Sequence, residues 1–134
     1  MLMQNEKSEY SVLVVDDDED TRYALAKMLA KCGCDIAEVS SVEAALTMLS
    51  EASFDIVFSD MRFHGGVDGD VLLETVNQQY PDIEVVLMSC YMDAERKARL
   101  MEKGAAMCLE KPFFKDVCAE TLAIVGDRFN RKAA

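Results

Sequence analysis

The stretch SVLVVDDDED, residues 11–20, decides the fold and raises the first question about function. Four apolar residues at 12–15 predict a buried strand, and an unbroken acidic run follows them directly. Neighbouring carboxylates repel one another when they ionise, so an acidic run at a strand end has an electrostatic cost. Either a cation lies beside Asp16 and Asp17, or the acidic run is simply solvated. For residues 18–20 we favour solvation, because acidic residues are common in the first turn of a helix.

Outward from residues 11–20, apolar runs alternate with amphipathic segments along the whole chain. The apolar runs predict strands at 11–15, 34–39, 54–60, 83–89 and 105–110. Helices are predicted at about 20–32, after a capping box of Ser40 and Glu43, at about 69–80, at about 93–103, and after the KPFF segment. Five strand–helix pairs in this order predict an α/β fold with a doubly wound, five-stranded parallel sheet and helices on both faces.

Length and charge limit the classes of function. The 134 residues fit one domain, which we predict at 11–129 between tails at 1–10 and 130–134. The net charge of −11 repels phosphate backbones and anionic membranes, so we expect no direct binding to nucleic acid or membrane. No stretch has the pattern of a signal peptide or a membrane span, and we expect a cytoplasmic protein. Five cysteines with one histidine favour free buried thiols over a zinc site.

Polar side chains that can bind a metal ion or take part in a reaction lie at the carboxyl ends of the predicted strands. In an open parallel sheet these ends share one edge, where ligands bind near the point at which strand order reverses. In chain order the residues at these ends are Asp16 with Asp17, Asp60, Ser89 and Lys111. Carboxylate oxygens suit Mg²⁺, and a lysine ammonium can neutralise charge on a phosphoryl group. The sequence therefore predicts a magnesium site with phosphoryl chemistry at this edge.

Four motifs in this order resemble the receiver domains of response regulators. They are VLVVDDDED at 12–20, DIVFSD at 55–60, VVLMS at 85–89 and LEKPF at 109–113. The resemblance covers about residues 11–128 and implies a flavodoxin-like, three-layer α/β/α fold with strand order 2-1-3-4-5. It also implies Mg²⁺-dependent transfer of a phosphoryl group from a histidine kinase or phosphotransfer protein to one aspartate. The phosphorylated form would then act on an output domain or effector protein.

The same resemblance implies roles for single residues. Asp60 is the phosphoacceptor and a metal ligand, Asp17 is a direct ligand of Mg²⁺, and Asp16 acts mainly through water. The other implied groups are the Arg62 backbone carbonyl as a ligand, and the Ser89 hydroxyl and Lys111 ammonium as partners of the phosphate. A carboxylate is a poor nucleophile toward an anionic phosphoryl group unless a metal and a cation screen the repulsion, so these groups are needed together.

Two features depart from the family pattern. The segment DMRFHGGVDG at 60–69 lacks the usual proline and is one residue longer, so we expect a more mobile loop with His64 exposed. Cys108 occupies the position of an aromatic residue that commonly turns inward on activation in this family. We predict that Tyr91 is the mobile aromatic instead. We also predict that the bulky side chains of Arg62 and Tyr91 slow hydrolysis of the phosphate.

Two other interpretations stay open at this point. A degenerate receiver could act as a phosphorylation-independent binding module, and the altered loop and Cys108 favour this second interpretation. The third is a phosphatase, because Asp16 and Asp18 have the Asp-x-Asp spacing that resembles haloacid-dehalogenase enzymes. Against it, Asp20 stands where those enzymes have Thr or Val, and Asp60 would have no role there.

Overall fold

Strands and helices alternate strictly along the chain in the computed structural model, which describes residues 10–63 and 65–133. The strands are β1 (Ser11–Val15), β2 (Asp35–Val39), β3 (Ile56–Asp60), β4 (Glu84–Ser89) and β5 (Met107–Glu110). The helices are α1 (Glu19–Lys31), α2 (Val42–Glu51), α3 (Gly69–Gln79), α4 (Ala94–Glu102) and α5 (Lys115–Ala133). The expectations for His64 and for the tail before Tyr10 lie outside the described residues.

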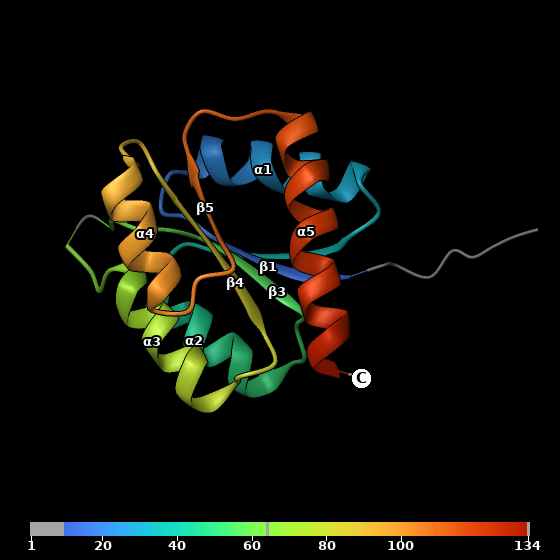
Figure 1. The fold of residues 1–134 in the computed structure, drawn as a ribbon, viewed down its shortest axis with the longest axis horizontal. Helices are drawn as coiled ribbons and strands as arrows, with labels where there is room; N and C mark the ends of the chain where they lie inside the picture. Colours follow the sequence, from blue (N-terminus) through green and yellow to red (C-terminus); the bar gives the residue numbers. More distant parts are fainter. Residues whose placement is uncertain (1–9, 64, 134) are drawn as a thin grey trace, which may run out of the picture.

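All five strands are parallel and lie in the order β2-β1-β3-β4-β5. This order confirms the predicted doubly wound sheet. β1, β3 and β4 are the inner strands, and their nearly continuous apolar runs are buried on both faces, as expected for central parallel strands. In Figure 1, α1 and α5 lie on one side of the sheet and α2, α3 and α4 on the other, which makes three layers.

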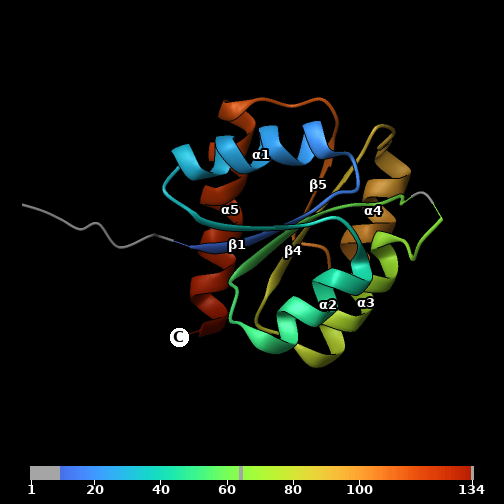
Figure 2. The same cartoon turned by 180° about the vertical axis from the view of Figure 1, so that it is seen from behind.

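Each face of the sheet has its own apolar core. Beneath α1 and α5, Leu25 and Leu29 pack with Cys118, Leu122 and Val125. The opposite core holds residues of α2, α3 and α4, among them Ala45, Leu49, Leu72, Val76 and Leu100. Figure 2 shows the same two helical layers from behind. Apolar residues at helical spacing thus form the buried faces of these helices, although Ala24 of α1 is exposed.

Two details of the predicted elements are wrong. The capping residue of α2 is Ser41 rather than Ser40, because Ser41 has the extended backbone of an N-cap and its Oγ accepts the Ala44 amide at 3.0 Å. Cys90 is exposed, whereas Cys34, Cys108 and Cys118 are buried as predicted. Cys90 follows directly after β4, where the chain leaves the sheet, and this position explains its exposure.

The first described residue, Tyr10, belongs to the core although it falls within the tail predicted at 1–10. Its ring contacts Phe129 edge to face, with centroids 6.3 Å apart. A Cβ atom on Gly126 would lie 2.3 Å from the Tyr10 hydroxyl, so this contact requires glycine in α5. The helix itself continues to Ala133, past the predicted boundary at 129. Among the helices of the described residues, none has the length and apolar character needed to cross a membrane.

Candidate functional site

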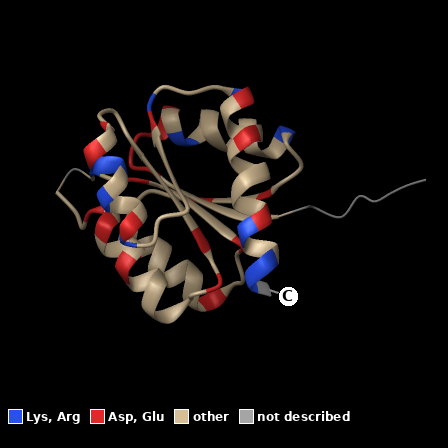
Figure 3. Cartoon of the chain, in the orientation of Figure 1, with Lys and Arg blue, Asp and Glu red and all other residues tan. Residues whose placement is uncertain are grey.

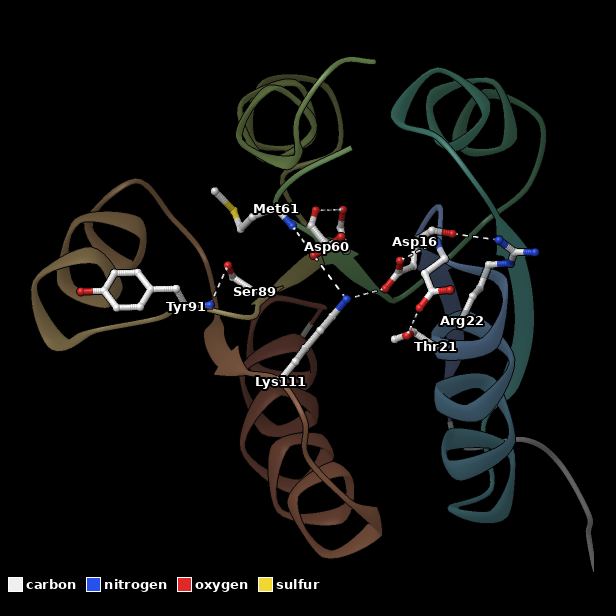
Figure 4. A network of polar contacts seen from close by, with 10 residues as sticks. Asp16, Thr21, Arg22, Asp60, Met61, Ser89, Tyr91 and Lys111 are labelled. Atoms are coloured by element: carbon white, nitrogen blue, oxygen red, sulfur yellow. Dashed lines mark hydrogen bonds and ion pairs between the residues drawn. The ribbon is translucent and has the colours of Figure 1, made fainter. Parts of the chain in front are cut away.

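The carboxyl ends of β1, β3, β4 and β5 bring the predicted site residues to one edge of the sheet (Figure 4). Asp60 is the last residue of β3 and Ser89 is the last residue of β4. Asp16 follows β1 directly, and Lys111 follows β5. Parallel pairing places Val15 beside Ser59, and Asp60 beside Met88, so neighbouring strands end at nearly the same level. This register makes residues far apart in sequence neighbours in space.

Asp16 is fully buried, and hydrogen bonds hold its backbone and its carboxylate. Its amide donates to the Val39 carbonyl at 3.2 Å, and its own carbonyl accepts from Arg22 Nη1 at 2.9 Å. Oδ1 accepts the Asp18 amide at 3.0 Å, and Oδ2 accepts Lys111 Nζ at 2.7 Å. A buried carboxylate is stable only when it is paired and hydrogen-bonded, and Asp16 meets both conditions. Its position is therefore tightly determined.

Lys111 connects the carboxylates of Asp16 and Asp60. Its Nζ lies 3.4 Å from Asp60 Oδ1, and 14% of its side chain is exposed. Burial lowers the pKa of Lys111, but the hydrogen bond and charge of Asp16 and the charge of Asp60 outweigh burial, and the pKa is raised overall. The ammonium therefore stays protonated at neutral pH.

Asp60 lies in an environment that opposes its ionisation. Burial raises its pKa most, Lys111 lowers it, Asp16 raises it, and the net result is a raised pKa. The Met61 amide donates to Asp60 Oδ1 at 3.0 Å, which favours the charged form. Burial is thus the main cause of the raised pKa of Asp60, whereas the carboxylates of Asp16 and Asp60 raise the pKa of Lys111 against the effect of its burial.

Three carboxylates of this edge can hold a metal ion together. Asp16, Asp17 and Asp60 each offer an oxygen atom, and the three atoms lie within 4.8 Å of one another. Hard oxygen donors of this kind, together with water, suit Mg²⁺. The excess negative charge around Asp60 also fits a divalent cation. Arg62, two residues after Asp60, has its side chain in solvent.

The residues predicted to sense the phosphate lie around the end of β4. Ser89 is buried, and its Oγ accepts the Tyr91 amide at 3.2 Å. Tyr91 points away from the carboxylates, with 62% of the residue exposed, and its hydroxyl donates to Asp93 Oδ2 at 2.9 Å. Cys108 is buried in β5, and burial raises the pKa of its thiol. The Tyr91 ring is therefore held at the surface in this structure.

Two polar residues at the start of α1 make contacts that were not predicted from the sequence. Arg22 donates to the Asp16 carbonyl and also pairs with Glu38 in β2, with 3.3 Å between Nε and Oε1. Thr21 donates a hydrogen bond to the Asp18 carboxylate. This bond agrees with assigning Asp18 to the helix start. A cationic residue one helical turn after an acidic strand end is the only signal that could have indicated Arg22.

The sequence profile of the response regulator receiver domain matches residues 12–123. The chain belongs to this family. Over 102 residues, 76% of its length, this receiver domain is 40% identical to the response regulator protein FleR of Pseudomonas aeruginosa. Over 123 residues, 92% of its length, it is 34% identical to the sensor histidine kinase RcsC of Salmonella typhimurium. It spans only 21% of FleR and 13% of RcsC, so these relatives contain much more than a receiver domain.

Solved structures of similar proteins have the same fold. Over 93% of this receiver domain, NtrX from Brucella abortus in complex with ATP superposes with a TM-score of 0.87 and 27% identity, and 28% of the NtrX chain is covered. The chemotaxis response regulator CheY4 of Vibrio cholerae gives a TM-score of 0.79 at 26% identity, over 86% of this chain and 97% of CheY4. The likeness to CheY4 extends over almost the whole of that chain, whereas NtrX is much longer.

Proposed function

We propose that this receiver domain accepts a phosphoryl group on Asp60 from the phosphohistidine of a histidine kinase or phosphotransfer protein. The phosphorylated domain then changes its contacts with an output domain or effector protein. One observation carries the proposal: Asp60 lies beside two further carboxylates and 3.4 Å from the Lys111 ammonium, at the carboxyl edge of the sheet. Support also comes from the relatives, which include a sensor histidine kinase and a DNA-binding transcriptional regulator, NtrC of Escherichia coli.

In the proposed reaction, an Asp60 carboxylate oxygen attacks the phosphorus atom, and the bond from phosphorus to the histidine nitrogen breaks. Lys111 neutralises charge on the transferred group, and the Ser89 hydroxyl donates a hydrogen bond to one of its oxygens. Bound Mg²⁺ supplies charge neutralisation for the phosphoryl oxygens. Its proposed ligands are the carboxylates of Asp17 and Asp60 and the Arg62 carbonyl, with Asp16 acting mainly through water. The hydrogen bonds that Asp16 makes to Asp18 and Lys111 support this secondary role.

The proposed signalling domain covers residues 11–129, with Tyr10 packed against it and short segments at either end. Transfer from a phosphohistidine requires access to a kinase that uses ATP, so we place the domain in the cytoplasm. We propose no catalytic turnover of an external substrate. Apart from accepting the group and losing it by hydrolysis, the domain acts by binding.

A phosphorylation-independent binding module is the second candidate. The observation in its favour is Cys108, a small buried residue that cannot turn as an aromatic ring would. A phosphatase of the haloacid-dehalogenase type has less support, because the Asp18 carboxylate accepts a hydrogen bond from Thr21 at the exposed start of α1. Turnover of p-nitrophenyl phosphate would support the phosphatase interpretation.

Intact mass after incubation with acetyl phosphate and Mg²⁺ tests the proposal. We expect the wild-type protein to gain one phosphoryl group, and Asp60→Asn or removal of Mg²⁺ to abolish the gain. Asp20→Asn is the matched control, since it removes one exposed carboxylate of the same acidic run outside the site. A wild-type protein that binds Mg²⁺ but gains no mass would favour the binding module.

A further inference from the structure

Arg22 links the turn after β1 to the neighbouring strand β2. Its Nη1 donates to the Asp16 carbonyl at 2.9 Å (Figure 4). Its Nε lies 3.3 Å from Glu38 Oε1. Only 18% of the Arg22 side chain is exposed, so the guanidinium is largely packed and not a free surface charge. Two partners on different segments use the fork of donors that distinguishes arginine from lysine.

The carbonyl that Arg22 contacts controls how the chain enters the acidic turn. The pairing of β1 with β2 ends at Val15 and Val39, and one further bond joins the Asp16 amide to the Val39 carbonyl. Beyond it the chain leaves the sheet. The peptide unit is planar, so the Asp16 carbonyl lies in the same plane as the amide and Cα of Asp17. A hydrogen bond to this carbonyl therefore restricts the direction from which the Asp17 side chain departs.

We propose that Arg22 is a positioning residue that holds the turn of residues 16–18 in the geometry required for Mg²⁺ binding. This inference rests on the proposed function, because it concerns the metal that phosphotransfer to Asp60 needs. Partners of metal ligands typically contribute 10-fold to 100-fold in metal affinity by orienting those ligands. Arg22 contacts the peptide unit that joins Asp16 to Asp17, through the Asp16 carbonyl, and not a reacting atom.

Charge and positioning predict effects of opposite sign at this residue. A cation close to the acidic residues repels Mg²⁺, so removal of the guanidinium would tighten Mg²⁺ binding if charge alone mattered. If Arg22 orients the turn, its removal weakens Mg²⁺ binding despite the lost repulsion. The direction of the change therefore separates the two effects without any measurement of phosphorylation.

Isothermal titration with Mg²⁺ on the whole chain tests the inference in Arg22→Gln, Arg22→Lys and the wild type. We expect Arg22→Gln to raise the Kd for Mg²⁺ about 10-fold. Arg22→Lys should recover only part of this loss, because it restores the charge without the fork. The matched control is Lys27→Gln, which removes a cation from an exposed position on the same helix, where Lys27 Nζ lies 5.3 Å from the centroid of the Tyr23 ring.

Amide hydrogen exchange without metal gives a second readout. The Asp18 amide donates to Asp16 Oδ1, so we expect it to exchange faster in Arg22→Gln and at the wild-type rate in Lys27→Gln. Should Arg22→Gln fail to fold, Arg22→Lys keeps the charge and loses the fork of donors, so its Kd for Mg²⁺ should still exceed that of the wild type. A folded Arg22→Gln protein that binds Mg²⁺ as tightly as the wild type would overturn the inference.

The failure of this inference can be told apart from failure of the proposed function. A wild-type protein that binds Mg²⁺ but takes up no phosphoryl group would remove the proposed function, and the Kd comparison would still decide the role of Arg22. Unchanged Kd values together with normal phosphorylation would reject the positioning role of Arg22 and leave the proposed function intact.

Discussion

Lys111 donates a 2.7 Å hydrogen bond to the buried carboxylate of Asp16, although 95 residues separate the two along the chain. This pair joins the turn after β1 to the turn after β5 across the carboxyl edge of the sheet. It also holds the ammonium 3.4 Å from Asp60 Oδ1. One cation thus stabilises a buried charge and stands where a transferred phosphoryl group would need neutralisation.

Replacing Lys111 should separate metal binding from phosphotransfer. In Lys111→Met we expect the rate of phosphorylation by acetyl phosphate to fall about 100-fold, the typical effect of losing one electrostatic donor. Mg²⁺ should bind at least as tightly, because a competing positive charge is gone. Intact mass over time measures the rate of phosphorylation, and calorimetric titration measures the Kd for Mg²⁺. Lys115→Met, at an exposed position at the start of α5, is the control, and a parallel loss of both properties in Lys111→Met would contradict the expectation.

The raised pKa of Asp60 predicts a pH dependence of stability in the absence of metal. Burial is its main cause, so the folded state binds the proton more tightly than the unfolded state does. The contribution of Asp60 to wild-type stability should therefore be fully present below about pH 4, the ordinary aspartate range, and be lost as pH rises through the raised pKa. Asp60→Asn cannot ionise and should lack this contribution.

Urea unfolding of the metal-free proteins at about pH 4 and pH 7 checks this expectation. The free energy of unfolding of Asp60→Asn minus that of the wild type should increase toward neutral pH. Addition of Mg²⁺ should reduce the difference, because the metal stabilises only the wild-type carboxylate. A difference that shrinks from pH 4 to pH 7 would show that Asp60 is more stable ionised than protonated.

Tyr91 is our candidate for the mobile aromatic of this domain. In the structure its hydroxyl donates to Asp93, while its amide donates to Ser89 Oγ, so engagement of Ser89 by phosphate would act directly on the Tyr91 backbone. The sequence contains no tryptophan, so tyrosine fluorescence is readable. We expect beryllium trifluoride with Mg²⁺ to change this fluorescence in the wild type and not in Tyr91→Phe. The same response in both proteins would exclude Tyr91.

The lifetime of the phosphorylated form should depend on Arg62 and Tyr91. Both side chains are exposed in this structure, Arg62 two residues after Asp60 and Tyr91 two residues after Ser89, and we predict that in the phosphorylated form they limit the approach of water to the phosphate. We expect Arg62→Ala and Tyr91→Ala each to shorten the half-time of dephosphorylation severalfold, followed by intact mass over time. Arg99→Ala, on an exposed position of α4, serves as the control. Unchanged half-times would show that water reaches the phosphate by another route.

Glu84 is a buried carboxylate at the opposite edge of the sheet, and two cations of α5 surround it. Arg128 Nε lies 3.0 Å from Oε1, and Lys132 Nζ lies 2.8 Å from Oε2, although the latter contact lacks hydrogen-bond geometry. Figure 3 shows Lys and Arg segments at this end of α5. Lys132 lies past the predicted boundary at 129, so its contact with Glu84 joins the last part of α5 to the sheet.

The double change Arg128→Gln with Lys132→Gln should lower the free energy of unfolding by about 2 kcal/mol, because it leaves the Glu84 charge buried without a partner. The effect should be smaller than the roughly 3–5 kcal/mol of fully buried pairs, since both cations are partly solvated. Glu84→Gln should cost less than the double change, because the released cations can hydrate. Urea unfolding measures all three proteins, with Arg131→Gln as an exposed control. If Glu84→Gln lowers the free energy of unfolding more than the double change does, the buried unpaired charge is not the main source of the loss.

Local patterns determined the order and type of the elements. Runs such as residues 12–15 and 85–88 are apolar without interruption, which predicts strands buried on both faces, and helical spacing marks the buried faces of α1 and α5. The parallel order then brought Asp16, Asp60 and Lys111 to one edge, because the carboxyl ends of parallel strands coincide. Their proximity could therefore be predicted from the sequence.

Only the tertiary structure decided which side chains hold these groups in place. The contact of Arg22 with the Asp16 carbonyl, the packing of Tyr10 against Gly126, and the pairing of Glu84 with α5 each join segments whose relative position no local pattern specifies. The shift of the α2 cap from Ser40 to Ser41 is similar, since both serines satisfy the local preference. Periodicity depends on a residue's own neighbours in sequence, whereas these contacts depend on strand register and on how each helix packs across the sheet.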